Sequence, residues 1–355
     1  MKGKRKARSR RTKTHGRLYS WLLLLSVLLV IGFGGWKIWS SDTVQMRFVY
    51  MWDYQQDIVT YSKKNNVDPF LVAAIIKNES NFKHDAVSKV GAVGLMQIMP
   101  ETGRWIAEQM GLENYQDSDL YKWLEAVGNA LQVENNIELE KKADEVIDLL
   151  EGAQEEDGYL NTYFQLVEPE KKWSNILECH ELYCAGHMME AAVAYAECTG
   201  KVKLLDIMCG MADHIYKRFI EDGAEGYPGH PEIELALLRM YRCTKKEKYK
   251  ELALHFINVR GVDSDYFCKE KERRKWTVWG ADPEDKECMQ CNAPVREQKK
   301  ATGHAVRAVY LYTGMADAAM ETGDTTLTEA CKTLWNNITQ CRMYVTGGIG
   351  SAYEG

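Results

Sequence analysis

The stretch Glu197-Cys198-Thr199-Gly200-Lys201 decides the fold class, because it separates two amphipathic segments, residues 181–200 and 202–220, that each follow a helical period. Joints of the same kind lie at residues 242–246 and 321–324, again between two helical patterns. Recurrent helix–turn–helix pairs indicate a solenoid or a closed toroid. The sequence therefore predicts a mainly α chain whose second part is built from helical hairpins.

The helical pattern extends over most of residues 121–355, and strand signals are scarce. We predict eight helices, at residues 121–134, 137–154, 181–200, 202–220, 231–243, 246–259, 302–323 and 325–343. Since a closed (α/α)6 toroid has twelve helices by definition, these eight predict a partial toroid. Such toroids are frequent in carbohydrate enzymes, although a fold alone does not establish a function.

The charge of the chain is divided unevenly. Residues 1–17 contain nine Lys or Arg and no Asp or Glu, so removing nine positive charges from the total of −6 leaves −15 for residues 18–355. A body this acidic argues against a nucleic-acid partner, since phosphate binding needs clustered cations. Hydrophobic residues make up 45% and charged residues 27% of the chain, which is typical of a globular protein and excludes a fully disordered one.

An uncharged span of nineteen residues, from Leu18 to Trp36, follows the basic run. At about 1.5 Å per residue, a helix of this length just crosses a bilayer core of about 30 Å. Aromatic residues mark its ends: Tyr19, Trp21, Trp36 and Trp39. We therefore expect a cytoplasmic tail at residues 1–17, a transmembrane anchor at 18–39 and an extracytoplasmic body at the cell membrane. A cleaved signal peptide ending near Gly32-Phe33-Gly34 is the alternative, and a nucleic-acid-binding tail is disfavoured by the adjacent apolar span.

Ten cysteines occur, and none precedes Cys179. Several fall in helical patterns, which favours buried thiols over disulfides. Cys288 and Cys291 form a lone C-x-x-C pair, but a zinc site needs two more ligands and none is obvious nearby. We therefore predict no structural disulfide and no metal site. Unpaired thiols suit a cytosolic protein whereas residues 1–120 look extracytoplasmic, and this mismatch indicates that two unlike pieces have been joined.

A helix signal opens the segment after the anchor. Asp68 can cap a helix and Pro69 suits its first turn. The run at residues 70–76 is apolar nearly all round, so we expect a buried helix that ends near Glu79. Apolar walls around Glu79 would raise its pKa and let it act as a general acid; the alternative is a solvated glutamate at a helix end. A further helix is expected from Pro100 to about Met110.

Two motifs in this segment resemble those of the soluble lytic transglycosylases, which have a lysozyme-like fold. They are Glu79-Ser80-Asn81-Phe82 and the run GAVGLMQIMPET from Gly91 to Thr102. The resemblance implies a lysozyme-like α domain at residues 45–120 that cleaves the β-1,4 bond between N-acetylmuramic acid and N-acetylglucosamine in peptidoglycan. It implies that Glu79 is the catalytic acid and then base, that Ser80 orients this carboxyl, and that Met96 and Gln97 line the sugar groove. No A-Y-N-like motif of that family follows, so the predicted domain is partial.

Polar and aromatic segments of residues 121–355 together resemble glycoside hydrolase family 127, the β-L-arabinofuranosidases. They are His180–His187, Gly229–Glu232, Pro294–Gln298, Gly303–Arg307 and Val345–Ser351. The resemblance implies an (α/α)6 barrel, retaining hydrolysis of terminal β-L-arabinofuranosides, and substrate contacts by His230, His304 and one of His180 or His187. For any one histidine alone, a capping or space-filling role is the alternative.

The family resemblance also implies a zinc-bound cysteine nucleophile, with Glu and further Cys as zinc ligands and a second Glu as acid/base. None of the ten cysteines stands in a matching context, and Glu354 is near but offset from the expected acid position. We therefore expect the zinc site to lie beyond residue 355 and no cofactor within this chain.

The two predicted domains, residues 45–120 and 121–355, meet without a flexible linker, whereas natural fusions usually join complete domains through exposed segments. Three hypotheses follow. The chain is an anchored peptidoglycan lytic transglycosylase fused to an arabinofuranosidase-like region, a family 127 fragment with a foreign front end, or a non-catalytic carbohydrate-binding protein tethered to the membrane through residues 18–36. All three predict a glycan partner.

Overall fold

The structure is a computed structural model that describes residues 33–34, 36–37, 53–89, 91–99, 102 and 116–350. It divides into two compact units, residues 1–83 and 84–355. No helix within the described ranges is long and apolar enough to cross a membrane. The predicted tail, almost all of the predicted anchor and almost all of the predicted helix from Pro100 lie outside these ranges.

The first unit contains two helices that pack against each other, α3 (Gln55–Lys64) and α4 (Pro69–Glu79). The predicted start of α4 is confirmed, because the Asp68 carboxylate accepts a hydrogen bond from the Phe70 N–H at 2.8 Å. The expected burial is wrong: Ile76 is the buried residue of α4, and Leu71 is 55% exposed. The apolar run predicted a helix correctly, but α3 covers only part of it.

Residues 84–99 form a compact turn at the start of the second unit. Val93 makes isolated antiparallel bridges to both flanking segments. The Gln97 side chain donates from Nε2 to the carbonyl oxygens of Ala86 and Gly94, at 2.8 and 3.0 Å. These hydrogen bonds close the turn.

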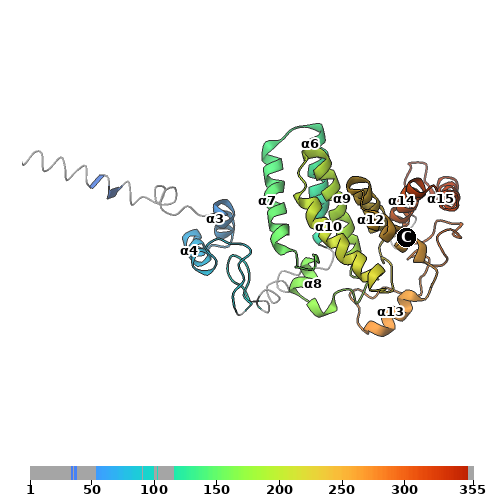
Figure 1. Ribbon diagram of the computed structural model, residues 1–355, viewed down its shortest axis with the longest axis horizontal. Coiled ribbons are helices and arrows are strands. Elements are labelled where there is room, and N and C mark those ends of the chain that lie inside the picture. Colours follow the sequence, from blue (N-terminus) through green and yellow to red (C-terminus); the bar gives the residue numbers. More distant parts are fainter. Residues whose placement is uncertain are drawn as a thin grey trace, which may run out of the picture. The chain divides into compact units, whose positions relative to one another are not determined.

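Four helical hairpins make up most of the second unit (Figure 1). They are α6 (Asp117–Val133) with α7 (Ile137–Ala153), α9 (Glu181–Thr199) with α10 (Lys203–Tyr216), α11 (Ile233–Thr244) with α12 (Glu247–Val259), and α14 (Ala305–Thr322) with α15 (Thr325–Asn337). The eight helices predicted for this region are confirmed, two of them continued by the π-helical turns η3 (Lys217–Glu221) and η4 (Ile338–Arg342). Three shorter elements were not predicted: α8 (Thr162–Leu166), η2 (Pro169–Lys171) and α13 (Tyr266–Arg274).

The hairpins stack side by side in two layers. Helix α9 packs against α6 and α11, and α11 packs against α14, so these four helices form one layer, the inner layer. The outer layer contains their partners α7, α10, α12 and α15, with α10 packed against α7 and α12. The described residues form helices, turns and isolated bridges but no strand. This arrangement is consistent with the predicted part of an (α/α)6 toroid.

The three predicted joints between helices share one hydrogen-bond pattern. The last helical residue is a threonine, Thr199, Thr244 or Thr322, whose Oγ1 donates to the carbonyl four residues earlier at 2.7 Å in each case. The same Oγ1 accepts from the N–H two residues later. The intervening residue is left-handed, with φ of 73° at Gly200, 60° at Lys245 and 69° at Gly323. The repeated sequence therefore encodes a repeated helix end.

Helix α9 lies at the centre of the core. Fourteen of its 19 residues are buried, as expected for a helix that is apolar on nearly all sides. Gly128 of α6 lets the two helices approach closely, since a Cβ there would lie 2.9 Å from the carbonyl carbon of Ala194. The buried polar side chains of α9, among them His187 and Glu190, therefore lie within the protein rather than in water.

Candidate functional site

The four histidines selected from the sequence lie together in one cluster of aromatic rings. His180 caps α9, His304 caps α14, and His230 lies just before α11, so the starts of three inner helices meet here. The ring centroids of His180 and His230 are 5.7 Å apart, and those of His230 and His304 are 6.0 Å apart. His187 joins the group from the second turn of α9 through Tyr183.

Two tyrosines complete the cluster. The Tyr183 ring lies between those of His187 and His230, with centroid distances of 4.4 and 4.6 Å. The Tyr310 ring of α14 is 5.8 Å from each of the same two histidines. The ring cluster thus comprises His180, Tyr183, His187, His230, His304 and Tyr310. Sequence reasoning missed Tyr310. This residue lies on the helix that His304 begins, and that position was the one sign in the sequence that could have identified it.

Burial keeps the imidazoles of the ring cluster neutral. It lowers the pKa of His180 to about 4 and that of His187 to about 3. Burial also lowers the pKa of His304, with the charge of Arg307 as the next cause. It lowers the pKa of His230 as well, with the neighbouring His180 as the next cause. Near neutral pH each ring therefore has one N–H and one lone pair.

The hydrogen bonds of the rings fix which nitrogen carries the proton. Nδ1 of His180 lies 2.6 Å from the backbone oxygen of residue 178, and Nδ1 of His230 lies 2.9 Å from that of residue 231. A carbonyl only accepts, so both Nδ1 atoms are protonated and both Nε2 atoms keep a lone pair. In His304, Nδ1 instead accepts from the Arg307 N–H at 3.4 Å, which leaves Nε2 as a donor. The cluster therefore offers acceptors and a donor, as hydroxyl groups require.

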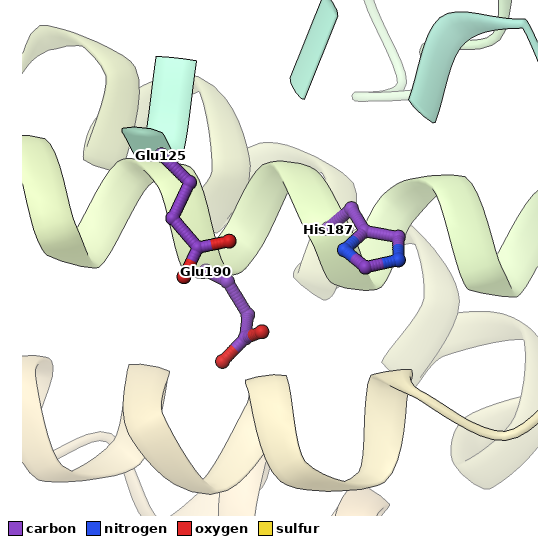
Figure 2. A group of neighbouring side chains, drawn as sticks. All are labelled: Glu125, His187 and Glu190. Atoms are coloured by element: carbon purple, nitrogen blue, oxygen red, sulfur yellow. The ribbon is translucent and has the colours of Figure 1, made fainter. Parts of the chain in front are cut away.

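A group of buried and half-buried carboxyls, here the carboxyl cluster, adjoins His187. It consists of Glu125 on α6, Glu190 on α9 and Glu232 at the start of α11. Figure 2 shows Glu190 and His187 on one helix with Glu125 reaching toward Glu190. Nη1 of Arg239 lies 2.7 Å from Glu190 Oε1 and 3.4 Å from Glu125 Oε1. The first two carboxyls therefore share one guanidinium.

Glu232 is the most enclosed of these carboxyls. It is fully buried, its Oε1 lies 3.6 Å from His187 Nδ1, and it fills the space that Gly186 leaves open. A Cβ at Gly186 would lie 1.5 Å from Glu232 Oε2. Burial, followed by the neighbouring carboxyl of Glu190, raises the pKa of Glu232 well above its usual range. The protonated form of Glu232 is therefore favoured over the ionised form relative to an exposed glutamate.

Three side chains could hold a metal ion. One ligand atom from each of Glu125, His187 and Glu190 lies within 4.8 Å of the others, and one imidazole with two carboxylates suits Zn²⁺ or Mn²⁺. Arg239 pairs with both Glu125 and Glu190, so part of the negative charge of these carboxylates is already balanced. The cysteine-based zinc site implied by the family resemblance does not fit the described residues, because no cysteine belongs to a group at metal-ligand distances there.

The predicted transglycosylase residues have mostly local contacts. Glu79 ends α4 and is exposed, so the expected apolar enclosure is wrong and the solvated alternative describes it. The Ser80 hydroxyl donates to Ile76 O at 3.2 Å, which closes the helix end. Met96 is 40% exposed, and the Gln97 amide is engaged in closing its own turn. The catalytic and groove-lining roles of these residues stay predictions.

Comparison with known proteins gives long matches to one family and short matches to transglycosylases. A family described as β-L-arabinofuranosidase, GH127 catalytic domain, matches residues 43–355. The non-reducing end β-L-arabinofuranosidase of Bifidobacterium longum is 40% identical over 249 residues, which cover 68% of this chain and 38% of the relative. A solved GH127 β-L-arabinofuranosidase from Geobacillus stearothermophilus T6 has 43% identity and a TM-score of 0.66, covering 85% of this chain and 44% of that one.

One short match is to the membrane-bound lytic murein transglycosylase E of Buchnera aphidicola, which is 40% identical over 85 residues, 23% of this chain and 39% of the relative. The family match from residue 43 includes the segment that the motifs assigned to a separate transglycosylase domain, so a chimera of two families is not confirmed. The chain spans about two fifths of the length of its arabinofuranosidase relatives.

Proposed function

The chain belongs to glycoside hydrolase family 127, and on this basis we propose that its ring cluster binds a terminal β-L-arabinofuranosyl unit within an enzyme that cleaves the glycosidic bond of that unit. The observation that carries the proposal is the meeting of His180, His230 and His304 at the starts of three inner helices. The matched relatives described above are β-L-arabinofuranosidases, which supports this choice of sugar.

The chemistry of the ring cluster suits a furanose. A sugar hydroxyl donates one hydrogen bond and accepts others, so it pairs with the Nε2 acceptor of His230 and with the Nε2–H donor of His304. The C–H faces of the sugar suit contact with the rings of Tyr183 and Tyr310. Lowered pKa values matter here, because a protonated imidazole has no acceptor nitrogen.

Bond cleavage needs a nucleophile and a proton donor in addition to this binding surface. In the described part of the chain no cysteine belongs to a metal-binding group of side chains. We therefore assign sugar binding, and not the cleavage step, to the ring cluster.

Titration calorimetry with methyl β-L-arabinofuranoside tests this proposal. We expect binding by the whole chain and an affinity about tenfold or more lower in His230→Ala, since a lost buried hydrogen bond typically costs 1–3 kcal/mol, roughly. His255→Ala is the matched control, because His255 lies on outer helix α12 and contacts Phe256 rather than the ring cluster. Equal affinity of His230→Ala and the unchanged chain, with both folded, would contradict the proposal.

A second candidate function is peptidoglycan cleavage with Glu79 as the acid. Its support is the Glu79-Ser80 motif with the GAVGLMQIMPET run, together with the 85-residue match to a lytic murein transglycosylase. Digestion of cell wall followed by muropeptide analysis tests it. Anhydro-muropeptides should fall by about 10²-fold or more in Glu79→Gln but not in Asp57→Asn, an exposed acid on α3. If the unchanged chain releases none, this candidate is discarded.

A further inference from the structure

A cavity of about 360 Å³ lies between the segment that precedes α9, the π-helical turn η3 and helix α13. It shares no lining residue with the ring cluster or the carboxyl cluster. Trp173 and Tyr266 give it aromatic walls, and three arginines line it, Arg218, Arg273 and Arg274. Its volume is in the range of small-ligand sites.

Arg218 has no carboxylate partner in the described part of the chain. Its guanidinium lies over the Trp173 ring, 5.7 Å from the centroid, and its Nε atom is buried without a hydrogen bond. Lys217, one residue earlier, forms an ion pair with Asp222 at 2.6 Å on the surface. Both belong to η3, and π-helical turns are frequent at functional sites. A half-buried guanidinium without a counter-ion is unusual, because desolvating a charge is costly unless it is paired.

The other two arginines of the cavity each lie near a carboxylate, although the buried guanidinium nitrogens of Arg274 make no hydrogen bond to the described residues. Arg274 is almost fully buried and lies 3.3 Å from Glu178, and Arg273 lies 3.3 Å from Glu225 at the surface. Glu270 accepts backbone N–H bonds from the segment before α9, at 2.8 and 3.3 Å. These carboxylates therefore have partners of their own, and Arg218 forms no ion pair with any described carboxylate, although its charge acts on the buried Glu181 carboxyl.

We propose that this cavity binds an oxyanion through Arg218, either the carboxylate of an acidic sugar or a phosphate group. A guanidinium presents parallel N–H donors that fit both groups. Such a ligand supplies an ion-pair partner for Arg218, and the Trp173 and Tyr266 rings offer apolar surface to a sugar face. The site is separate from the proposed arabinofuranosyl site and does not depend on it.

The test is titration calorimetry of the full chain with D-galacturonate, inorganic phosphate and D-galactose. Tighter binding of galacturonate than of phosphate identifies an acidic sugar as the ligand class, and the reverse order identifies a phosphate group. No detectable binding of either anion overturns the proposal, and so does galactose binding as tightly as galacturonate.

Variants separate a specific site from general charge effects. Arg218→Gln should weaken anion binding about tenfold or more, whereas the neighbouring Lys217→Gln should leave it unchanged. Glu225→Gln should strengthen binding, because it releases Arg273 at the rim, and as an exposed substitution it leaves the core intact. Equal weakening by the Arg218 and Lys217 variants would overturn the proposal, as would unchanged or weaker binding by Glu225→Gln.

Discussion

Glu181 is a buried carboxyl that holds two segments together at the start of α9. It is 3% exposed, its Oε1 accepts from the Tyr159 hydroxyl at 2.7 Å, and its Oε2 accepts from the Trp173 N–H at 2.9 Å. Burial raises its pKa to about 7, although these hydrogen bonds act in the opposite direction. In the folded protein Glu181 therefore stays protonated over a pH range in which an exposed glutamate is ionised.

This raised pKa predicts a pH-dependent effect of Glu181→Gln. The protonated Glu181 carboxyl adds to the free energy of unfolding. This contribution is fully present below the pKa of an unfolded glutamate and is lost as the pH rises through about 7. A neutral glutamine has no proton to lose. Between pH 5 and pH 8 the free energy of unfolding of Glu181→Gln should therefore rise by about 2–3 kcal/mol relative to that of the unchanged chain. Urea unfolding at both pH values measures this. Glu156→Gln, an exposed acid, is the control and should show no such change; a pH-independent difference in Glu181→Gln would contradict the prediction.

Gly186 is required by the carboxyl that occupies its side-chain space. A methyl group at Gly186 would overlap Glu232 Oε2, so Gly186→Ala should destabilise the second unit by about 1–3 kcal/mol or more, although alanine usually stabilises a helix. Chemical unfolding measures the loss. In Gly186→Ala/Glu232→Ala the overlap is gone, so the double variant should lose less than the two single changes together. Additive losses would show that the two residues are not coupled.

The sequence selected four members of the ring cluster as site residues, whereas of the carboxyl cluster only Glu232 fell within a selected segment. His180, His230 and His304 stand in short motifs at helix starts, where a local pattern is visible. Glu125, Glu190 and Arg239 come from three different helices, and only their packing brings them together. Helical periodicity predicts which face of a helix is buried but not which residue of another helix it meets.

At the scale of single elements, one hairpin joint departs from its two counterparts. Gly200 and Gly323 have left-handed φ at no steric cost, whereas Lys245 has φ of 60° with a Cβ atom. Lys245→Gly should therefore stabilise the protein by up to about 1 kcal/mol, seen as a rise of a few degrees in Tm. The reciprocal change Gly200→Lys should destabilise it by a similar amount, since no atom lies within 4 Å of a Cβ there and only the backbone is strained. A loss of stability in Lys245→Gly, or a gain in Gly200→Lys, would contradict the prediction.

The positions of helices were predictable where the helical period is strong, whereas the degree to which a helix is buried was harder to predict. The eight hairpin helices follow clear 3.6-residue periods, and the structure confirms them. Helix α13 was missed because most of its residues are charged and it buries only Tyr266, Phe267 and Glu270. Helix α4 was recognised but is largely exposed, because an apolar run does not reveal how much of it a neighbour will cover.

At the scale of the whole molecule, the cysteines belong to a helical core rather than to a disulfide framework. The structure places none of the ten in a disulfide. Cys179, Cys184, Cys209 and Cys291 are buried, and Cys341 is exposed. Burial raises the pKa of the Cys184 and Cys291 thiols, which keeps them protonated and slow to react.

This distribution predicts a graded thiol reactivity and no metal requirement. In the folded chain Cys341 should react with a thiol reagent well before the four buried cysteines, and in denaturant all ten should react. Elemental analysis of the purified chain should find less than one zinc per molecule, since Arg239 already pairs with Glu125 and Glu190. Timed alkylation with mass spectrometry measures the first outcome, and Cys341→Ser should remove the fast phase. Two or more disulfides in the isolated protein would contradict the thiol prediction, because burial would then not keep the cysteines unpaired. One tightly held zinc per molecule would contradict the metal prediction, because the pairing of Arg239 with Glu125 and Glu190 would then not be sufficient.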